Sequence, residues 1–126
     1  MPEKTGQSIE EKLALLKSKF RAELGAKFDN IQTLLDRLAD NQQPELALAE
    51  LYRLVHSLVG AGGTFGMHDM SIQARVFEEP LKQLYQQPEL FNTEAHMQLQ
   101  RLFNDLKNSV SRDMRDSNGV AATKKS

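Results

Sequence analysis

The sequence predicts an all-α protein, an antiparallel four-helix bundle with an additional N-terminal helix. Apolar residues recur every three or four positions along most of the chain, which is the period of an α-helix, and no stretch shows sustained strand alternation. Only 7 Gly and 4 Pro interrupt the 126 residues, and four of the glycines are crowded between positions 60 and 66. The 40% hydrophobic and 26% charged residues are typical of an ordinary globular domain.

The first 40 residues carry two apolar stripes at helical spacing, separated by Gly25. We expect the additional helix on the first stripe and the first core helix on the second, with Gly25 either a break between them or a weak point within one helix. Pro44 closes this region, because proline disfavours helical geometry in the residue before it and suits the first turn of the next helix. The stripes are Ile9, Leu13, Leu16, Phe20 and Leu24, then Phe28, Ile31, Leu35 and Leu38.

Three further helices are expected after Pro44. The first covers about residues 45–62 and the second about residues 69–85, with Pro80 inside it. Proline in a helix removes a backbone hydrogen bond at a cost of about 3 kcal/mol, so we expect a kink there. The last helix carries the apolar residues Ala95, Leu99, Leu102, Leu106 and Val110 on one face.

One folded domain is expected over residues 8–115, between a flexible N-terminus at 1–7 and a flexible tail at 116–126, where the apolar period is lost. The net charge of −1 gives no electrostatic reason to bind nucleic acid or an anionic membrane. No apolar run approaches the roughly 20 residues that cross a bilayer, and residues 1–7 lack the apolar region of a secretory signal. The absence of cysteine excludes disulfides and suits a reducing compartment. We therefore expect a monomeric cytoplasmic protein.

The stretch around His56 is the most informative part of the sequence. On a helical wheel of about 100° per residue, the core stripe of this helix falls within an arc of about 80°. His56 lies at least about 120° from every member of that stripe, and is therefore predicted to face solvent, although an isolated histidine is more often a core residue. The stripe consists of Ala47, Leu51, Leu54, Leu58 and Gly62.

Gly60 and Gly63 follow His56 at i+4 and i+7, and therefore lie along the same helix face. Each glycine inside a helix costs about 1 kcal/mol relative to alanine. Because glycine has no side chain, the surface beside the exposed imidazole is bare, and another macromolecule could approach it without steric collision. The alternative is that these glycines form a helix cap and turn, which suits Gly63 and Gly66 better than Gly60.

Glu78 is the candidate partner of His56 from the following helix. It shares one flank with Ser71 and Arg75, beside the apolar stripe of Met70, Ala74, Phe77, Leu81 and Leu84. A carboxylate there could hold the Nδ1–H of His56 and leave Nε2 unprotonated and nucleophilic. The alternative is a solvated surface glutamate.

The segment His56-Ser57-Leu58-Val59-Gly60-Ala61-Gly62-Gly63-Thr64-Phe65-Gly66-Met67 resembles the signature of histidine-containing phosphotransfer (HPt) domains. Among them are the phosphotransfer domains of chemotaxis histidine kinases. The family pattern is His, any residue, an apolar residue, usually Lys, then Gly, followed by a glycine-rich turn. The match is dense from Leu51 to about Leu84 and includes the acidic Glu78.

The resemblance implies an antiparallel four-helix bundle that works in bacterial two-component phosphorelays. His56 would carry a phosphoryl group on Nε2, exchanged with aspartates of receiver domains, and Glu78 would orient the ring. The chain would be a carrier and not an enzyme, because no P-loop or kinase-type nucleotide segment is present. It would need no cofactor, since Mg²⁺ would belong to the receiver. Receiver docking would involve Gly60, Gly63, Val59, Tyr52 and Arg53.

Val59 departs from the family pattern, since it stands where the family usually has lysine. An exposed ion pair is worth about 0.2–1 kcal/mol, so its loss predicts at most a several-fold effect, and Arg53 at i−3 from His56 could supply a substitute charge. One alternative is a degenerate HPt-like module that binds a signalling partner without carrying phosphate. Another is a metal- or cofactor-binding bundle, for which His56, His68 and His96 provide no ligand pair at i, i+3 or i+4 spacing.

Overall fold

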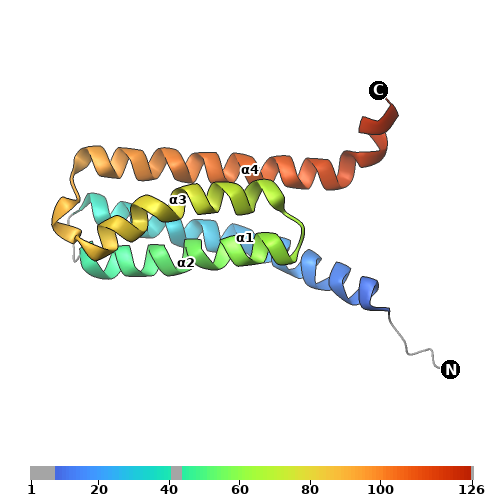
Figure 1. Cartoon of the computed structure of the whole chain (residues 1–126), viewed down its shortest axis with the longest axis horizontal. Coiled ribbons are helices and arrows are strands. Elements are labelled where there is room, and N and C mark those ends of the chain that lie inside the picture. Colours follow the sequence, from blue (N-terminus) through green and yellow to red (C-terminus); the bar gives the residue numbers. More distant parts are fainter. Residues whose placement is uncertain (1–7, 41–43, 126) are drawn as a thin grey trace.

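Four long helices run side by side in the computed structural model, and consecutive helices point in opposite directions (Figure 1). The structure describes residues 8–40 and 44–125, with side chains to residue 115. The described part contains no strand, which confirms the predicted all-α class. The helices are α1 (Ile9–Ala39), α2 (Pro44–Thr64), α3 (His68–Gln86) and α4 (Thr93–Lys125), and the 3-10 helix η1 (Pro88–Leu90) joins α3 to α4.

The additional N-terminal helix expected from the sequence does not exist as a separate element, and that prediction is wrong. α1 passes through Gly25 without a break, so the two apolar stripes belong to one helix. Gly25 is exposed and nothing lies within 4 Å of the position its Cβ would occupy. A cost of about 1 kcal/mol does not end a helix whose neighbouring residues, Ala22 to Lys27, are mostly strong helix formers. α1 begins at a capping box formed by Ser8 and Glu11.

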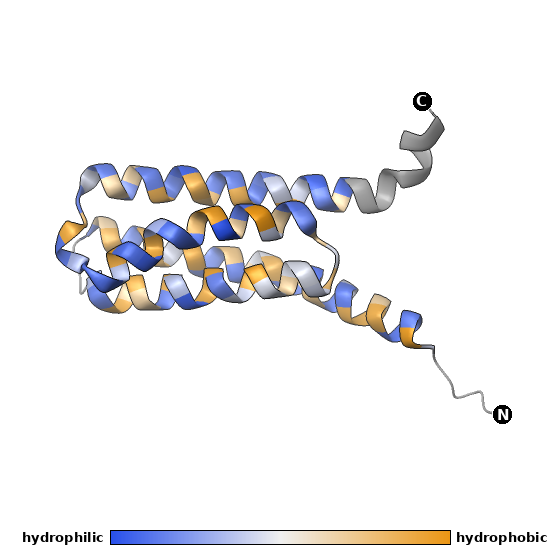
Figure 2. Cartoon of the chain, viewed as in Figure 1, coloured by the Kyte–Doolittle hydropathy of each residue, from blue (hydrophilic) through white to orange (hydrophobic). Residues whose placement is uncertain are grey.

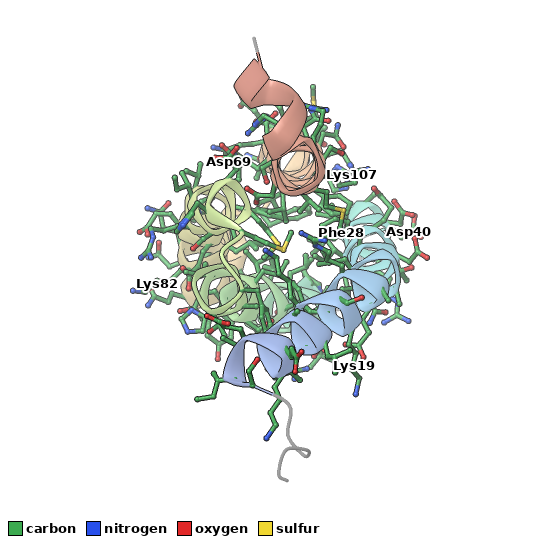
Figure 3. All side chains as sticks on the ribbon, turned by 90° about the vertical axis from the view of Figure 1, so that its right-hand side faces the viewer. Lys19, Phe28, Asp40, Asp69, Lys82 and Lys107 are labelled. Carbon is green, nitrogen blue, oxygen red and sulfur yellow. The ribbon has the colours of Figure 1, made fainter. Side chains whose placement is uncertain are left out.

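The apolar faces of all four helices meet along the bundle axis. Viewed along that axis, Phe28 points into the interior while Lys19 and Lys82 point outwards (Figure 3). The predicted stripe of α3 is entirely buried. On α2, Val55 is buried more deeply than the predicted core residue Leu54, and on α4, Phe103 is buried more deeply than the predicted Leu102. Each helix packs on two neighbours, so its buried arc is wider than one stripe. The innermost residues are Ile31, Leu35, Leu38, Leu48, Leu51, Val55, Met70, Ala74, Phe77, Leu81, Leu99, Phe103 and Leu106.

α2 and α3 form the most extensive helix pair, and their connection depends on two glycines. Gly62 is buried where the helices cross, and a Cβ there would lie 2.7 Å from Ser71 Cβ and 2.9 Å from the Met67 carbonyl oxygen. Only glycine therefore allows this approach. Gly66 turns the chain with a φ of 72°, and the Met67 N–H donates to the Gly62 carbonyl oxygen at 2.8 Å. This turn fixes the register of α3 against α2.

The first turn of α3, directly after this connection, is held by α4. The carboxylate of Asp113 accepts hydrogen bonds from the backbone N–H groups of Asp69 (3.1 Å) and Met70 (2.7 Å) at the first turn of α3. These N–H groups have no partner within their own helix, so Asp113 acts as a cap supplied by a neighbouring helix. Arg112 adds an ion pair to Asp69 at 3.2 Å.

α3 and α4 both extend beyond positions at which the sequence predicted a kink or an end. α3 continues through Pro80 as one helix. Residues 116–125, expected to be a flexible tail, continue the backbone of α4 as helix, whereas residues 1–7 and 126 lie outside the described residues. Among the described helices, none combines the length and the apolar character needed to cross a membrane.

Candidate functional site

His56 stands on the outer edge of α2, next to α3. Its side chain is 67% exposed, while Val55 and Leu58 on the same helix are buried in the core. The α-helical period explains the contrast, since His56 lies about 100° from Val55 around the helix axis and away from the buried arc. The imidazole is thus presented to solvent by a helix whose opposite face is buried in the core.

Glu78 of α3 contacts the His56 ring at Nδ1 through its Oε2. A carboxylate can only accept a hydrogen bond, so the Nδ1–H donates, and in the neutral imidazole Nε2 is then the unprotonated nitrogen. Among the described residues, none forms a hydrogen bond with Nε2. The Glu78 side chain is only 16% exposed, whereas that of His56 is 67% exposed, so the carboxylate lies deeper in the surface than the ring it contacts. The arrangement leaves one lone pair of the imidazole free for attack on an electrophile.

Gly60 and Gly63 extend the face of His56 towards the end of α2. Both are exposed, both lie inside the helix, and nothing lies within 4 Å of the position of a Cβ at either residue. The cap-and-turn alternative therefore describes Gly66, with its positive φ, but neither of these two residues. No packing constraint explains their lack of a side chain. The backbone beside His56 is bare on this side.

On the other side of His56, two tyrosines border the site. The Tyr52 ring lies 5.9 Å from the imidazole and stacks on Tyr85 of α3 at 5.6 Å, with 20° between the ring planes. A hollow of about 360 Å³ adjoins these rings, and His56, Ala49 and Arg53 also line it. Tyr85 was not among the residues selected from the sequence. The signal was present, because Tyr85 follows Glu78 at i+7 and so lies on the same flank of α3.

Arg53 and Val59, which were also expected at the site, form no hydrogen bond with His56. Arg53 is exposed and forms an ion pair with Glu50, one turn earlier on α2, and no hydrogen bond or ion pair joins it to His56. Val59 is half-buried and packs against the core. Its carbonyl oxygen accepts a hydrogen bond from Ser71 Oγ at 3.0 Å, which ties α2 to α3 one turn from His56.

The two other histidines lie elsewhere. His68 is exposed at the first residue of α3, and the half-buried His96 donates from Nε2 to the Leu35 carbonyl oxygen at 2.9 Å. Within residues 8–40 and 44–125, no three His, Asp or Glu side chains are grouped so that they could hold a metal ion. His56 is the histidine that combines exposure, a carboxylate at Nδ1 and a bare neighbouring surface.

Comparison with known proteins gives one family. The sequence model of the Hpt domain matches residues 15–109, which is most of the chain and includes His56, Glu78 and the glycine-rich turn. Searches of curated proteins and of solved structures returned no match. Hpt domains are phosphocarriers rather than kinases; they act in histidine phosphotransfer within phosphorelays and interact with receiver domains. The resemblance read from the glycine-rich segment is confirmed, and this chain belongs to the Hpt domain family.

Proposed function

We propose that this chain is a histidine phosphotransfer protein of a bacterial two-component phosphorelay, and that Nε2 of His56 carries the phosphoryl group. The observation that supports this assignment is the contact between His56 Nδ1 and Glu78 Oε2 on an exposed helix edge. It leaves Nε2 as a free nucleophilic nitrogen that faces solvent. We also propose a cytoplasmic setting, which suits a chain without cysteine.

The proposed transfer is a direct displacement at phosphorus. The Nε2 lone pair of His56 attacks the phosphorus of an aspartyl phosphate, the N–P bond forms, and the P–O bond to the receiver's carboxylate breaks with its electron pair on oxygen. The imidazole gains a positive charge without losing its Nδ1 proton, and the carboxylate of Glu78 stabilises that charge. The reverse displacement returns the phosphoryl group to a second receiver. The proposal assigns no cofactor to this chain and leaves Mg²⁺ to the receiver.

Docking of the receiver is assigned to the surface on both sides of His56. Gly60 and Gly63 let the receiver backbone approach the imidazole closely, because no side chain stands in the way. Tyr52 and Arg53 border the hollow on the opposite side, and the half-buried Val59, next to Gly60 in the sequence, is included in the proposed surface. A flat surface next to the nucleophile suits a partner whose reactive aspartyl phosphate must come within bonding distance of Nε2.

The test is transfer from a phosphorylated receiver to the purified chain. The expected product is an acid-labile, base-stable phosphate on this protein, formed at the expense of the receiver's aspartyl phosphate. The His56→Gln variant is expected to form none, because it lacks the imidazole to which the phosphoryl group is assigned. Phosphate on the His56→Gln protein, at His68 or His96 for example, would refute the assignment.

A second candidate is the degenerate module that binds a partner without carrying phosphate, and Val59 in place of lysine is the observation that favours it. The same experiment separates the two functions. Receiver binding without any transfer to the parent protein would establish the degenerate module. A Val59→Lys variant that gains transfer would show that the missing lysine is the reason.

A further inference from the structure

The first turns of α1 project from the bundle and contact little of it (Figure 1). We call residues 8–19 the arm. Most of the arm precedes residue 15, where the match to the Hpt domain begins. Its large apolar side chains are exposed, and they give the orange bands on this segment in Figure 2. The exposed fractions are 76% for Ile9, 45% for Leu13, 58% for Leu15 and 52% for Leu16.

The arm has the features of a helix built to pair with another helix. The capping box at Ser8 and Glu11 specifies its first turn, with both hydrogen bonds at 3.1 Å. Ile9, Leu13, Leu16 and Phe20 follow one another at spacings of four, three and four residues, which is the d–a–d–a seam of a coiled coil. Phe20 already packs on Phe65 of the α2–α3 turn at 5.1 Å. The apolar seam therefore starts at the bundle and runs outwards, and beyond Phe20 its side chains are exposed among the residues that the structure describes.

We propose that the arm of a second copy of this chain covers the seam, in an antiparallel pair related by a two-fold axis. The charges along the arm favour this direction. Glu10 occupies the outer turn, whereas Lys17 and Lys19 lie nearer the bundle. Antiparallel pairing places Glu10 of each copy beside Lys17 of the other, in equivalent e positions. Parallel pairing would place Lys12 beside Lys17 twice, and would align the two helix dipoles instead of opposing them.

The size of the seam predicts a dimer that depends on concentration. Apolar patches of about 300–600 Å² are the largest that a typical monomer exposes. Two patches of that size, one on each copy, would bury about 600–1,200 Å² in total, which is at or below the lower limit of about 1,200 Å² for specific interfaces. Lys12 and Lys19, which face each other across the second edge of the antiparallel pair, lower the affinity further. Because α1 packs on α2 and α4 whereas His56 lies on the α2–α3 edge, both copies keep their histidines accessible.

The first experiment measures sedimentation of the full chain from low micromolar to near-millimolar concentration. We expect a monomer–dimer equilibrium in the parent protein and a monomer throughout for Leu13→Glu. The matched control is Ile72→Glu, which places the same charge on a 60% exposed side chain of α3 and should dimerise like the parent. A parent protein that stays monomeric, as the sequence led us to expect, overturns the inference, as does a Leu13→Glu protein that still dimerises.

The second experiment tests the direction of pairing. Lys17→Glu should weaken dimerisation severalfold, because it faces Glu10 of the partner with a like charge, and adding Glu10→Lys should restore it. In a parallel pair, Lys17→Glu would instead strengthen dimerisation, since it removes the contact with Lys12. That outcome, or the absence of rescue in the double variant, overturns the antiparallel arrangement. Circular dichroism of each variant verifies that the helices remain intact.

Discussion

The carboxylate of Glu78, on another helix, contacts the His56 ring at Nδ1, and we propose that this contact orients the imidazole. We expect Glu78→Ala to slow phosphoryl transfer from a receiver by about tenfold, the equivalent of about 1.4 kcal/mol of activation free energy. Nε2 remains present, but a smaller share of the molecules holds the reactive tautomer in the reactive orientation. Stopped reactions sampled for phosphohistidine give the rate.

Glu78→Gln is the informative companion, because its amide oxygen can still accept the Nδ1–H. It should transfer faster than Glu78→Ala and more slowly than the parent, since it cannot offset the charge of the phosphorylated ring. Transfer at the parent rate in Glu78→Ala would show that the contact is dispensable, and Glu78 would then be an ordinary surface glutamate.

A variant at Gly60 can test the proposed docking surface without disturbing the fold. Gly60→Gln should reduce the transfer rate strongly, because the new side chain occupies the approach to His56, while the helical circular dichroism stays equal or increases. Gly25→Gln is the matched control, since Gly25 is also an exposed helical glycine with open space around it, but it lies on α1. It should change transfer little. Equal transfer rates for the parent and Gly60→Gln would contradict the proposed docking surface.

Which site residues could be predicted from the sequence depends on how local their geometry is. The helical wheel places His56 and Gly60 on an outer face, because that position follows from the period of one helix. The flank of α3 that carries Glu78 follows in the same way. Two contacts could not be predicted from the helical period: the ion pair of Arg53 with Glu50 and the stack of Tyr52 on Tyr85. The first depends on side-chain rotamers, and the second also depends on how far α2 and α3 are displaced along each other.

At the level of the helices, the crossing of α2 and α3 is limited by Gly62. Gly62→Ala should destabilise the protein by about 1–3 kcal/mol, because its Cβ would overlap Ser71 Cβ and the Met67 carbonyl, and backbone must move. Gly63→Ala, one residue later, should stabilise by about 0.5–1 kcal/mol, since open space surrounds that position. Urea unfolding monitored at the helical dichroism band compares the two. The two variants should change the free energy of unfolding in opposite directions, and equal changes would mean that α2 and α3 cross less closely than the structure shows.

The cap that α4 provides for α3 is the second feature at this scale. Asp113→Ala should cost about 1 kcal/mol of unfolding free energy, because two N–H groups of α3 lose their acceptor. Asp105→Ala, an exposed aspartate of the same helix, should have no measurable effect and serves as the control. If both variants unfold like the parent, solvent caps α3 as well as Asp113 does.

The helices themselves were more predictable than their boundaries and caps. The stripe of α3 was correct because five apolar residues repeat at one period and all face the same interior. Gly25 was ambiguous because a single glycine weakens a helix by less than its neighbours strengthen it. Asp113 gave no signal, because its partners lie more than 40 positions earlier in the sequence and meet it only after the bundle has formed.

For the molecule as a whole, proline substitutions along α1 can show where the arm ends and the cooperatively folded bundle begins. Ala14→Pro should unfold at nearly the urea concentration of the parent and transfer phosphate at an equal rate, because the side chains around it lie outside the core. Ala22→Pro, also exposed and on the same helix, should cost about 3 kcal/mol or more, since it breaks α1 next to the buried Leu24. Equal destabilisation by both would mean that the arm is part of the cooperative folding unit.

The stacked tyrosines give this protein a built-in optical reporter. The chain contains two tyrosines and no tryptophan, and both tyrosines lie beside His56. All tyrosine emission of this chain therefore originates where α2 and α3 meet beside His56, and the chain has no tryptophan whose stronger emission would mask it. If His56 carries a phosphoryl group and a receiver docks over the hollow, as we propose, each event should change the polarity around these rings directly. Ultraviolet fluorescence of the unlabelled protein can thus follow both events in real time.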